Sequence, residues 1–220
     1  MDNEDWLEDP LIIRTDNDSL KRRKLKNPQD DKQNDLWWNF HFATRLKLDG
    51  ADYFCRQVLG AASSPDNLGL PLLAHRQLKW YLDAFFFELM SAYYILLQEL
   101  NVAFAYDFGL EPKDVNWDKI KNKLPESLDK HMEKEWEKEW FDKVRRHRHM
   151  ATHHYLVPTG HYQAGWGDKP LDYAEHEVSI YYLDNTGKAK GEKISICKDY
   201  LKNMVKYISS VWEKMLQEFQ

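Results

Sequence analysis

The sequence predicts a mainly α-helical protein, a four-helix bundle with a β-hairpin inserted before its last helix. Three observations lead to this fold. Apolar residues recur at helical spacing over several long stretches, one of these stretches is apolar almost all round, and one segment near the C-terminus alternates apolar with polar residues. With 220 residues, 43% of them hydrophobic, the chain is long enough for one sizeable core.

The first 35 residues differ in composition from the rest. They are polar and mixed in charge, with one apolar run at 11–13 and a basic run at 21–26. We interpret residues 1–35 as a flexible or loosely docked arm, and an arm that attracts RNA is the alternative. Residues 36–220 are expected to form a single helical domain.

Two aromatic-rich helices open that domain. The first is expected over about residues 36–59, where Gly50 could kink or interrupt it. Residues 60–71 form a predicted loop. The second helix, about residues 72–101, is apolar almost all round, which is typical of a helix at the centre of a bundle.

A short helix near residues 112–123 is expected to precede a long third helix over about residues 125–154. Pro158 and Gly160 favour its termination. The long helix shows a strict fourfold spacing of large apolar residues. This stripe consists of Leu128, Met132, Trp136, Trp140 and Val144.

A β-hairpin is predicted at about residues 176–197. Val178 and Ile180 alternate with polar residues, and residues 184–187 (Asp-Asn-Thr-Gly) favour a turn before the chain runs back. A last amphipathic helix, over about residues 198–219, completes the predicted bundle.

Composition argues against several classes of protein. The net charge of −5 disfavours a general coat for nucleic acid, so contact with a polyanion requires a local basic patch. Cys55 and Cys197 are the two cysteines and lie far apart in sequence, which predicts neither a disulfide framework nor a cysteine-based zinc site. With no recognisable signal peptide, membrane span or cofactor motif, we expect a cytoplasmic protein without a cofactor.

Residues 145–154 are the stretch most indicative of chemistry. They place three arginines and four histidines near the end of the third predicted helix. Arginine is always charged and its planar fork grips phosphate oxygens, while histidine gains or loses a proton near neutral pH. Together these residue types indicate chemistry on a phosphodiester.

A helical projection separates the stretch into two groups. His147 and His154 fall on the core side, where we expect partly buried histidines hydrogen-bonded to a neighbour. Arg145 and Arg146 are interpreted either as cations near the helix end or as contacts to RNA. The second group shares a flank beside the core and consists of Arg148, His149, Thr152 and His153.

Glu88 lies on an apolar face of the second predicted helix. A buried carboxylate needs a positive partner or a strongly shifted pKa. The basic flank could supply the partner, so we expect Glu88 to orient an arginine or a histidine there. A place at the rim of the core, or a local ion pair, is the alternative. Asp83 is a weaker candidate of the same kind.

The segment Arg148-His149-Met150-Ala151-Thr152-His153 resembles the signature of HEPN domains (higher eukaryote and prokaryote nucleotide-binding), an arginine and a histidine separated by four to six residues. HEPN proteins are small helical bundles, and many are metal-independent ribonucleases in toxin–antitoxin, phage-defence and RNA-processing systems. The hairpin is an elaboration of this pattern. Arg146 as the first residue, or His154 as the last, would give an alternative register.

The resemblance implies an endoribonuclease. Arg148 would bind the scissile phosphate and His153 would act as general acid/base while the ribose 2′-OH attacks, which leaves a cyclic phosphate. His149, Thr152 and Glu88 would support this pair. The resemblance also implies an RNA substrate, a homodimer whose two motifs face each other, and an antitoxin or nucleotidyltransferase as partner.

Two other interpretations stay open. A bundle without activity could bind nucleotide, RNA or a protein through the same flank. Alternatively, His149 and His153 stand four residues apart on a helix, a spacing at which two imidazoles can share a metal ion with a carboxylate from another helix. The three arginines nearby would repel such a cation.

Overall fold

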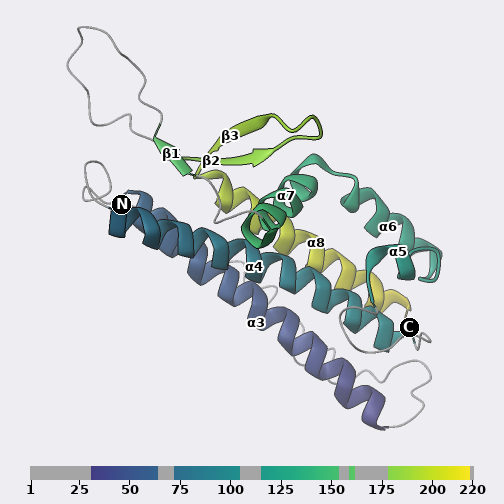
Figure 1. Cartoon of the computed structure of the whole chain (residues 1–220). Helices are drawn as coiled ribbons and strands as arrows, with labels where there is room; N and C mark the ends of the chain where they lie inside the picture. The colour runs from purple at the N-terminus through teal and green to yellow at the C-terminus, as the bar shows by residue number, and fades with distance from the viewer. Residues whose placement is uncertain (1–30, 64–71, 105–114, 154–158, 162–177, 219–220) are drawn as a thin grey trace, which may run out of the picture. The chain divides into compact units, whose positions relative to one another are not determined.

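The computed structural model describes residues 31–63, 72–104, 115–153, 159–161 and 178–218 (Figure 1). Six helices hold 79% of these residues, and a small antiparallel hairpin precedes the last helix. The mainly helical class and the place of the hairpin are therefore confirmed. Residues 1–30 of the predicted arm lie outside the described residues, whereas residues 31–35 are helical, so the expected boundary of the arm at residue 35 is wrong.

Three long helices form where the sequence predicts them: α3 (Asp31–Ala62), α4 (Leu72–Ala103) and α8 (Ile196–Glu218). Within the described ranges, none of the helices combines the length and apolar character of a membrane-spanning segment. α3 runs through Gly50 without interruption. A side chain at Gly50 would come within 3.1 Å of Glu88 Oε2, so this glycine provides room for a carboxylate of α4.

The predicted third helix is wrong as a single helix. After the short α5 (Trp117–Ile120), the chain forms α6 (Glu126–Trp136) and then α7 (Glu139–His153), with a break at residues 137–138. A fourfold spacing drifts around a helix by about 40° at each step, so one straight helix cannot keep the whole stripe against a single core. On α7 the buried residues are Phe141, Val144 and His147, whereas Trp140 is only half-buried.

Three strands form an antiparallel sheet in the order β1 (Thr159–His161), β2 (Val178–Leu183) and β3 (Ala189–Lys193). The predicted hairpin corresponds to β2 and β3, with Leu183 opposite Ala189. Asp184 closes its turn, because Oδ1 accepts hydrogen bonds from the N–H groups of Thr186 and Lys188. β1 is an addition that the alternation pattern did not indicate.

Contacts between residues divide the chain into two compact units, and unit 1 and unit 2 refer below only to their described residues. Unit 1 comprises the described parts of residues 1–47, 91–136 and 204–220. Unit 2 comprises those of residues 48–90 and 137–203. Helices α3, α4 and α8 contribute residues to both units, while α6 belongs to unit 1 and α7 with the sheet belongs to unit 2.

The core of unit 1 contains a buried carboxylate that has hydrogen-bond partners on both oxygens. Glu99 on α4 is fully buried, with His41 Nδ1 3.0 Å from its Oε1. Trp212 Nε1 donates to its Oε2 at 3.1 Å, and the rings of His41 and Trp212 are 4.4 Å apart. Because a buried carboxylate is costly without partners, these contacts make Glu99 compatible with an aromatic core.

Candidate arginine–histidine site

Helix α7 carries the arginine–histidine segment as far as His153, its last residue. Two acidic side chains lie in its first turn, where the positive end of the helix dipole favours them. Arg148 is half-buried at the edge of the buried face, and His149 and Thr152 are exposed. For Arg148, His149 and Thr152 this burial agrees with the projected place beside the core. The side chain of His153 and all of His154 lie outside the described residues.

Arg148 is held against α4 within unit 2. Its Cζ lies 4.7 Å from the centre of the Phe87 ring, a distance at which a cation is attracted by an aromatic face. Its Nη1 donates to Thr152 Oγ1, and that hydroxyl donates to the Arg148 carbonyl at 2.7 Å. Burial raises the pKa of Asp83, and the charge of Arg148 partly offsets this rise. An aromatic ring and a hydroxyl thus contact the guanidinium, and its charge acts on the Asp83 carboxyl.

On α4, the Asp83 carboxyl is close enough to Arg148 for the guanidinium charge to lower its pKa against the larger effect of burial, which raises it. Asp83 and Phe87 are one helical turn apart and therefore share a face of α4. Glu88 is half-buried, and its carboxylate lies beside Gly50 of α3. An orienting role for Glu88 toward the α7 flank stays a prediction.

Arg145 and Arg146 both bind Asp142, one turn earlier on α7. Arg145 Nη2 donates to Asp142 Oδ1 at 2.9 Å, and Arg146 Nε donates to Oδ2 at 2.6 Å. Arg146 also donates to the Leu183 carbonyl at 3.1 Å and to Asn185 Oδ1. Arg146 therefore ties the hairpin to α7.

His147 is fully buried and is part of a cluster that joins α7 to β3 and α8. Its ring stacks on Phe86 with centroids 4.6 Å apart, and its Nε2 is 3.5 Å from Glu192 Oε2. Glu192 Oε1 accepts from Lys143 Nζ at 2.7 Å, and its Oε2 accepts from the Tyr200 hydroxyl. The expectation of a packing histidine bound to a neighbour is confirmed.

The charges of this cluster follow from burial and hydrogen bonding. Burial alone would raise the pKa of Glu192, but hydrogen bonds from His147, Lys143 and Tyr200 outweigh it and lower the pKa to about 2. Burial opposes the charge on Lys143, yet its two glutamate partners raise its pKa. Burial lowers the pKa of His147, although Glu192 opposes this shift. At neutral pH the cluster therefore holds one ion pair and a neutral imidazole.

The sequence analysis did not identify Glu192, although the pairing of the predicted hairpin contains a signal for it. It pairs with Ile180 across the hairpin, and Ile180 is fully buried. Directly paired residues point to the same face of a sheet, so Glu192 occupies an inward-facing position. A carboxylate there predicts a cationic or hydrogen-bonding partner in the core.

A pocket of about 420 Å³ lies between α7 and the turn of the β2–β3 hairpin, within unit 2. Its lining residues come from two elements. They are Asp142, Arg145, Arg146, His149 and Met150 of α7, and Leu183, Asp184 and Gly187 of the hairpin.

The side chains that the structure describes do not include that of His153. No group of three or more histidine, cysteine, aspartate or glutamate residues among them could hold a metal ion. The carboxylate that the metal-site interpretation requires near His149 is therefore not identified.

Comparisons of the chain with protein-family models, with curated proteins and with solved structures found no match.

Proposed function

We propose that the protein is a HEPN-type endoribonuclease that cleaves RNA without a metal ion, in a cytoplasmic toxin–antitoxin or phage-defence system. The arrangement of Arg148 is the main support: a permanently charged, half-buried guanidinium on the helix that ends at His153. Phe87 and Thr152 restrain it before any substrate arrives. A restrained guanidinium loses less conformational freedom when it binds phosphate.

In the proposed reaction the ribose 2′-OH attacks the adjacent phosphorus and the 5′-oxygen of the next nucleotide leaves. His153 accepts the proton of the 2′-OH, and a second histidine, supplied by the second copy in a dimer, protonates the leaving oxygen. Arg148 stabilises the negative charge that grows on the phosphate oxygens. The products are a 2′,3′-cyclic phosphate and a free 5′-hydroxyl.

The test is cleavage of a mixed structured RNA pool by the purified protein in the presence of EDTA. We expect cut RNA with cyclic phosphate ends and intact DNA of the same sequence, since DNA lacks the 2′-OH. Activity that disappears with EDTA and returns with a divalent cation would instead favour the metal-site interpretation. A folded protein that binds RNA but leaves it uncut would be a non-enzymatic binding module.

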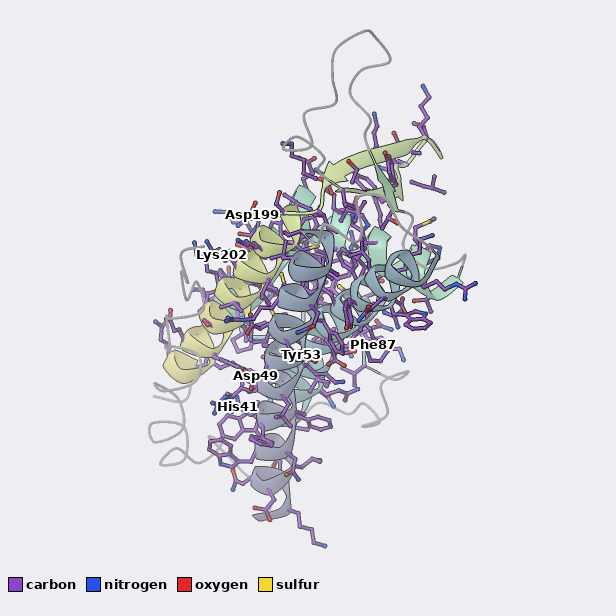
Figure 2. The ribbon with its side chains drawn as sticks, turned by 90° about the vertical axis from the view of Figure 1, so that its left-hand side faces the viewer. His41, Asp49, Tyr53, Phe87, Asp199 and Lys202 are labelled. Atoms are coloured by element: carbon purple, nitrogen blue, oxygen red, sulfur yellow. The ribbon has the colours of Figure 1, made fainter. Side chains whose placement is uncertain are left out.

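The proposed dimer brings together two copies of an apolar surface beside Arg148. Trp80 and Phe87 lie seven residues apart on α4, hence on one helix face, and their side chains are 59% and 43% exposed. Tyr53 on α3 of the same unit is also exposed (Figure 2). Exposed aromatic residues of this size are typical of protein interfaces, and one of them, Phe87, adjoins the guanidinium that a partner would face.

The variant Trp80→Lys is expected to be monomeric where the wild type is dimeric. A lysine at the centre of an apolar interface leaves a charge without a partner, and removing an aromatic residue there weakens association by about 2 kcal/mol or more. Sedimentation velocity measures the state, with cleavage assayed in parallel. Phe42→Lys, at a 57% exposed position of α3 in unit 1, is the control. A dimeric Trp80→Lys variant would contradict this interface.

A further inference from the structure

The pocket between α7 and the hairpin has the size of a small-ligand site. Its volume of about 420 Å³ falls in the lower part of the range typical of ligand pockets, roughly 300–1,000 Å³. All of its lining residues belong to unit 2, so one compact unit forms the whole site.

The walls of the pocket are held by bonds between the two elements. Arg146 of α7 binds the Leu183 carbonyl and Asn185 of the hairpin. The turn itself is closed by three hydrogen bonds to Asp184 Oδ1, from the Thr186 N–H, the Thr186 hydroxyl and the Lys188 N–H. A site that is already formed avoids the cost of ordering its loops when a ligand binds.

The lining combines apolar, cationic and acidic side chains, and its two arginines share Asp142 as a partner. Leu183 is 39% exposed at the end of β2, and Met150 faces the same pocket from α7. Arg145 carries a fixed charge, and His149 offers an imidazole ring. A planar ring joined to a phosphate matches this combination, because the ring buries apolar surface and the phosphate meets the guanidinium.

The pocket lies on the strip of α7 that leads to His153. Asp142, Arg146 and His149 follow one another at intervals of four and three residues, Met150 is adjacent to His149, and His153 stands four residues after His149. The His153 position lies about 140° around the helix from Arg148. A ligand in the pocket would therefore extend along α7 toward the His153 position, one of the two residues of the proposed motif.

We propose that this pocket binds one unpaired nucleotide of the RNA substrate, next to the phosphodiester that is cut. The base lies against Met150 and Leu183, and a phosphate lies near Arg145. A paired base is stacked within its duplex and cannot enter, so the pocket selects single-stranded segments. This inference rests on the proposed ribonuclease function, and it assigns to the hairpin the recognition of unpaired RNA.

The experiment measures binding of a labelled, unpaired RNA of about nine nucleotides, a length within the site sizes of single-strand binders. Its riboses carry 2′-O-methyl groups and cannot be cleaved, so binding is judged independently of activity. Leu183→Glu places a carboxylate at the pocket, and Leu46→Glu makes the same change at a 52% exposed position of α3 in unit 1. We expect Leu183→Glu to weaken binding about tenfold and Leu46→Glu less than about twofold.

Inorganic polyphosphate separates recognition of the base from repulsion of phosphate, because it carries charge without bases. We expect both leucine variants to bind polyphosphate equally. Met150→Ala, which removes apolar surface without adding charge and favours the helix, is expected to weaken RNA binding about threefold and leave polyphosphate binding unchanged.

Equal RNA affinity of the two leucine variants would contradict the proposed nucleotide pocket. So would a Leu183→Glu variant that loses RNA and polyphosphate binding to the same extent, or a wild-type protein that does not bind RNA. A selective effect of Leu183→Glu in a protein that cleaves no RNA would retain the pocket and reject the nuclease. RNA cleavage by the wild type, with no effect of Leu183→Glu on RNA binding, would retain the nuclease and reject the pocket.

Discussion

Replacing Arg148 with alanine should lower the rate of RNA cleavage at saturating RNA by about 10²- to 10³-fold, the usual loss for one group that stabilises transition-state charge. Arg148→Lys keeps the charge but lacks the planar fork that binds two phosphate oxygens and packs on Phe87. We therefore expect an intermediate loss for lysine, about tenfold or more.

His153→Ala should reduce cleavage as strongly, because the proton of the 2′-OH then has no acceptor within the site. Single-turnover assays on a defined RNA measure both variants. Lys130→Ala removes a 71% exposed cation of α6 and serves as the control for net charge, with less than a twofold change expected. Arg148 and His153 variants that cleave at the wild-type rate would remove the motif from the mechanism.

Glu192→Gln is expected to lower the free energy of unfolding by about 2–4 kcal/mol at neutral pH, because it leaves the Lys143 ammonium without its most buried partner. Glu139→Gln is the matched control. Glu139 binds the same ammonium at 2.9 Å, but its side chain is 83% exposed, whereas that of Glu192 is 13% exposed. Exposed ion pairs contribute about 0–1 kcal/mol, so the control should change little. Urea titrations measure both variants.

The same carboxylate predicts how stability depends on pH. The folded-state pKa of Glu192, about 2, lies below its ordinary value of 4.5. Its contribution is therefore present above pH 4.5 and is lost as the pH falls toward 2. The pKa of His147 is also lowered, so the unfolded chain takes up that proton first and stability begins to fall below about pH 6.5. Glu192→Gln should flatten the acid part of this profile; parallel wild-type and variant profiles would contradict the assignment.

Local patterns in the sequence were enough for most elements of the fold. α8 and the β2–β3 hairpin each repeat their spacing over consecutive residues, so their places follow from the chain itself. The break before α7 could not be predicted in this way, because the fourfold spacing of apolar residues from Leu128 to Val144 continues across residues 137–138. That break depends on which side chains meet a core, and Phe141 replaces Trp140 in that role.

In the candidate site too, the sequence predicts some features and not others. The position of Arg148 beside the buried face follows from about 100° of rotation per residue. Its neighbours on α4 could not be predicted, because they depend on the rotation of one helix against another. Asp83 and Phe87 share the face that meets Arg148, while Glu88, one residue further, lies against α3. Glu192 and His147 are separated by 45 residues, beyond any local pattern.

Both units require α8 for a closed core. Unit 2 buries Tyr200 and Leu201 of this helix, and unit 1 buries Trp212 and Met215. During synthesis α3 and α4 therefore leave the ribosome with apolar faces uncovered, and neither unit can complete its packing until α8 has followed. Such exposed chains are prone to aggregation and are bound by chaperones. Any chemistry that needs a folded α7 should consequently begin only after α8 has been translated.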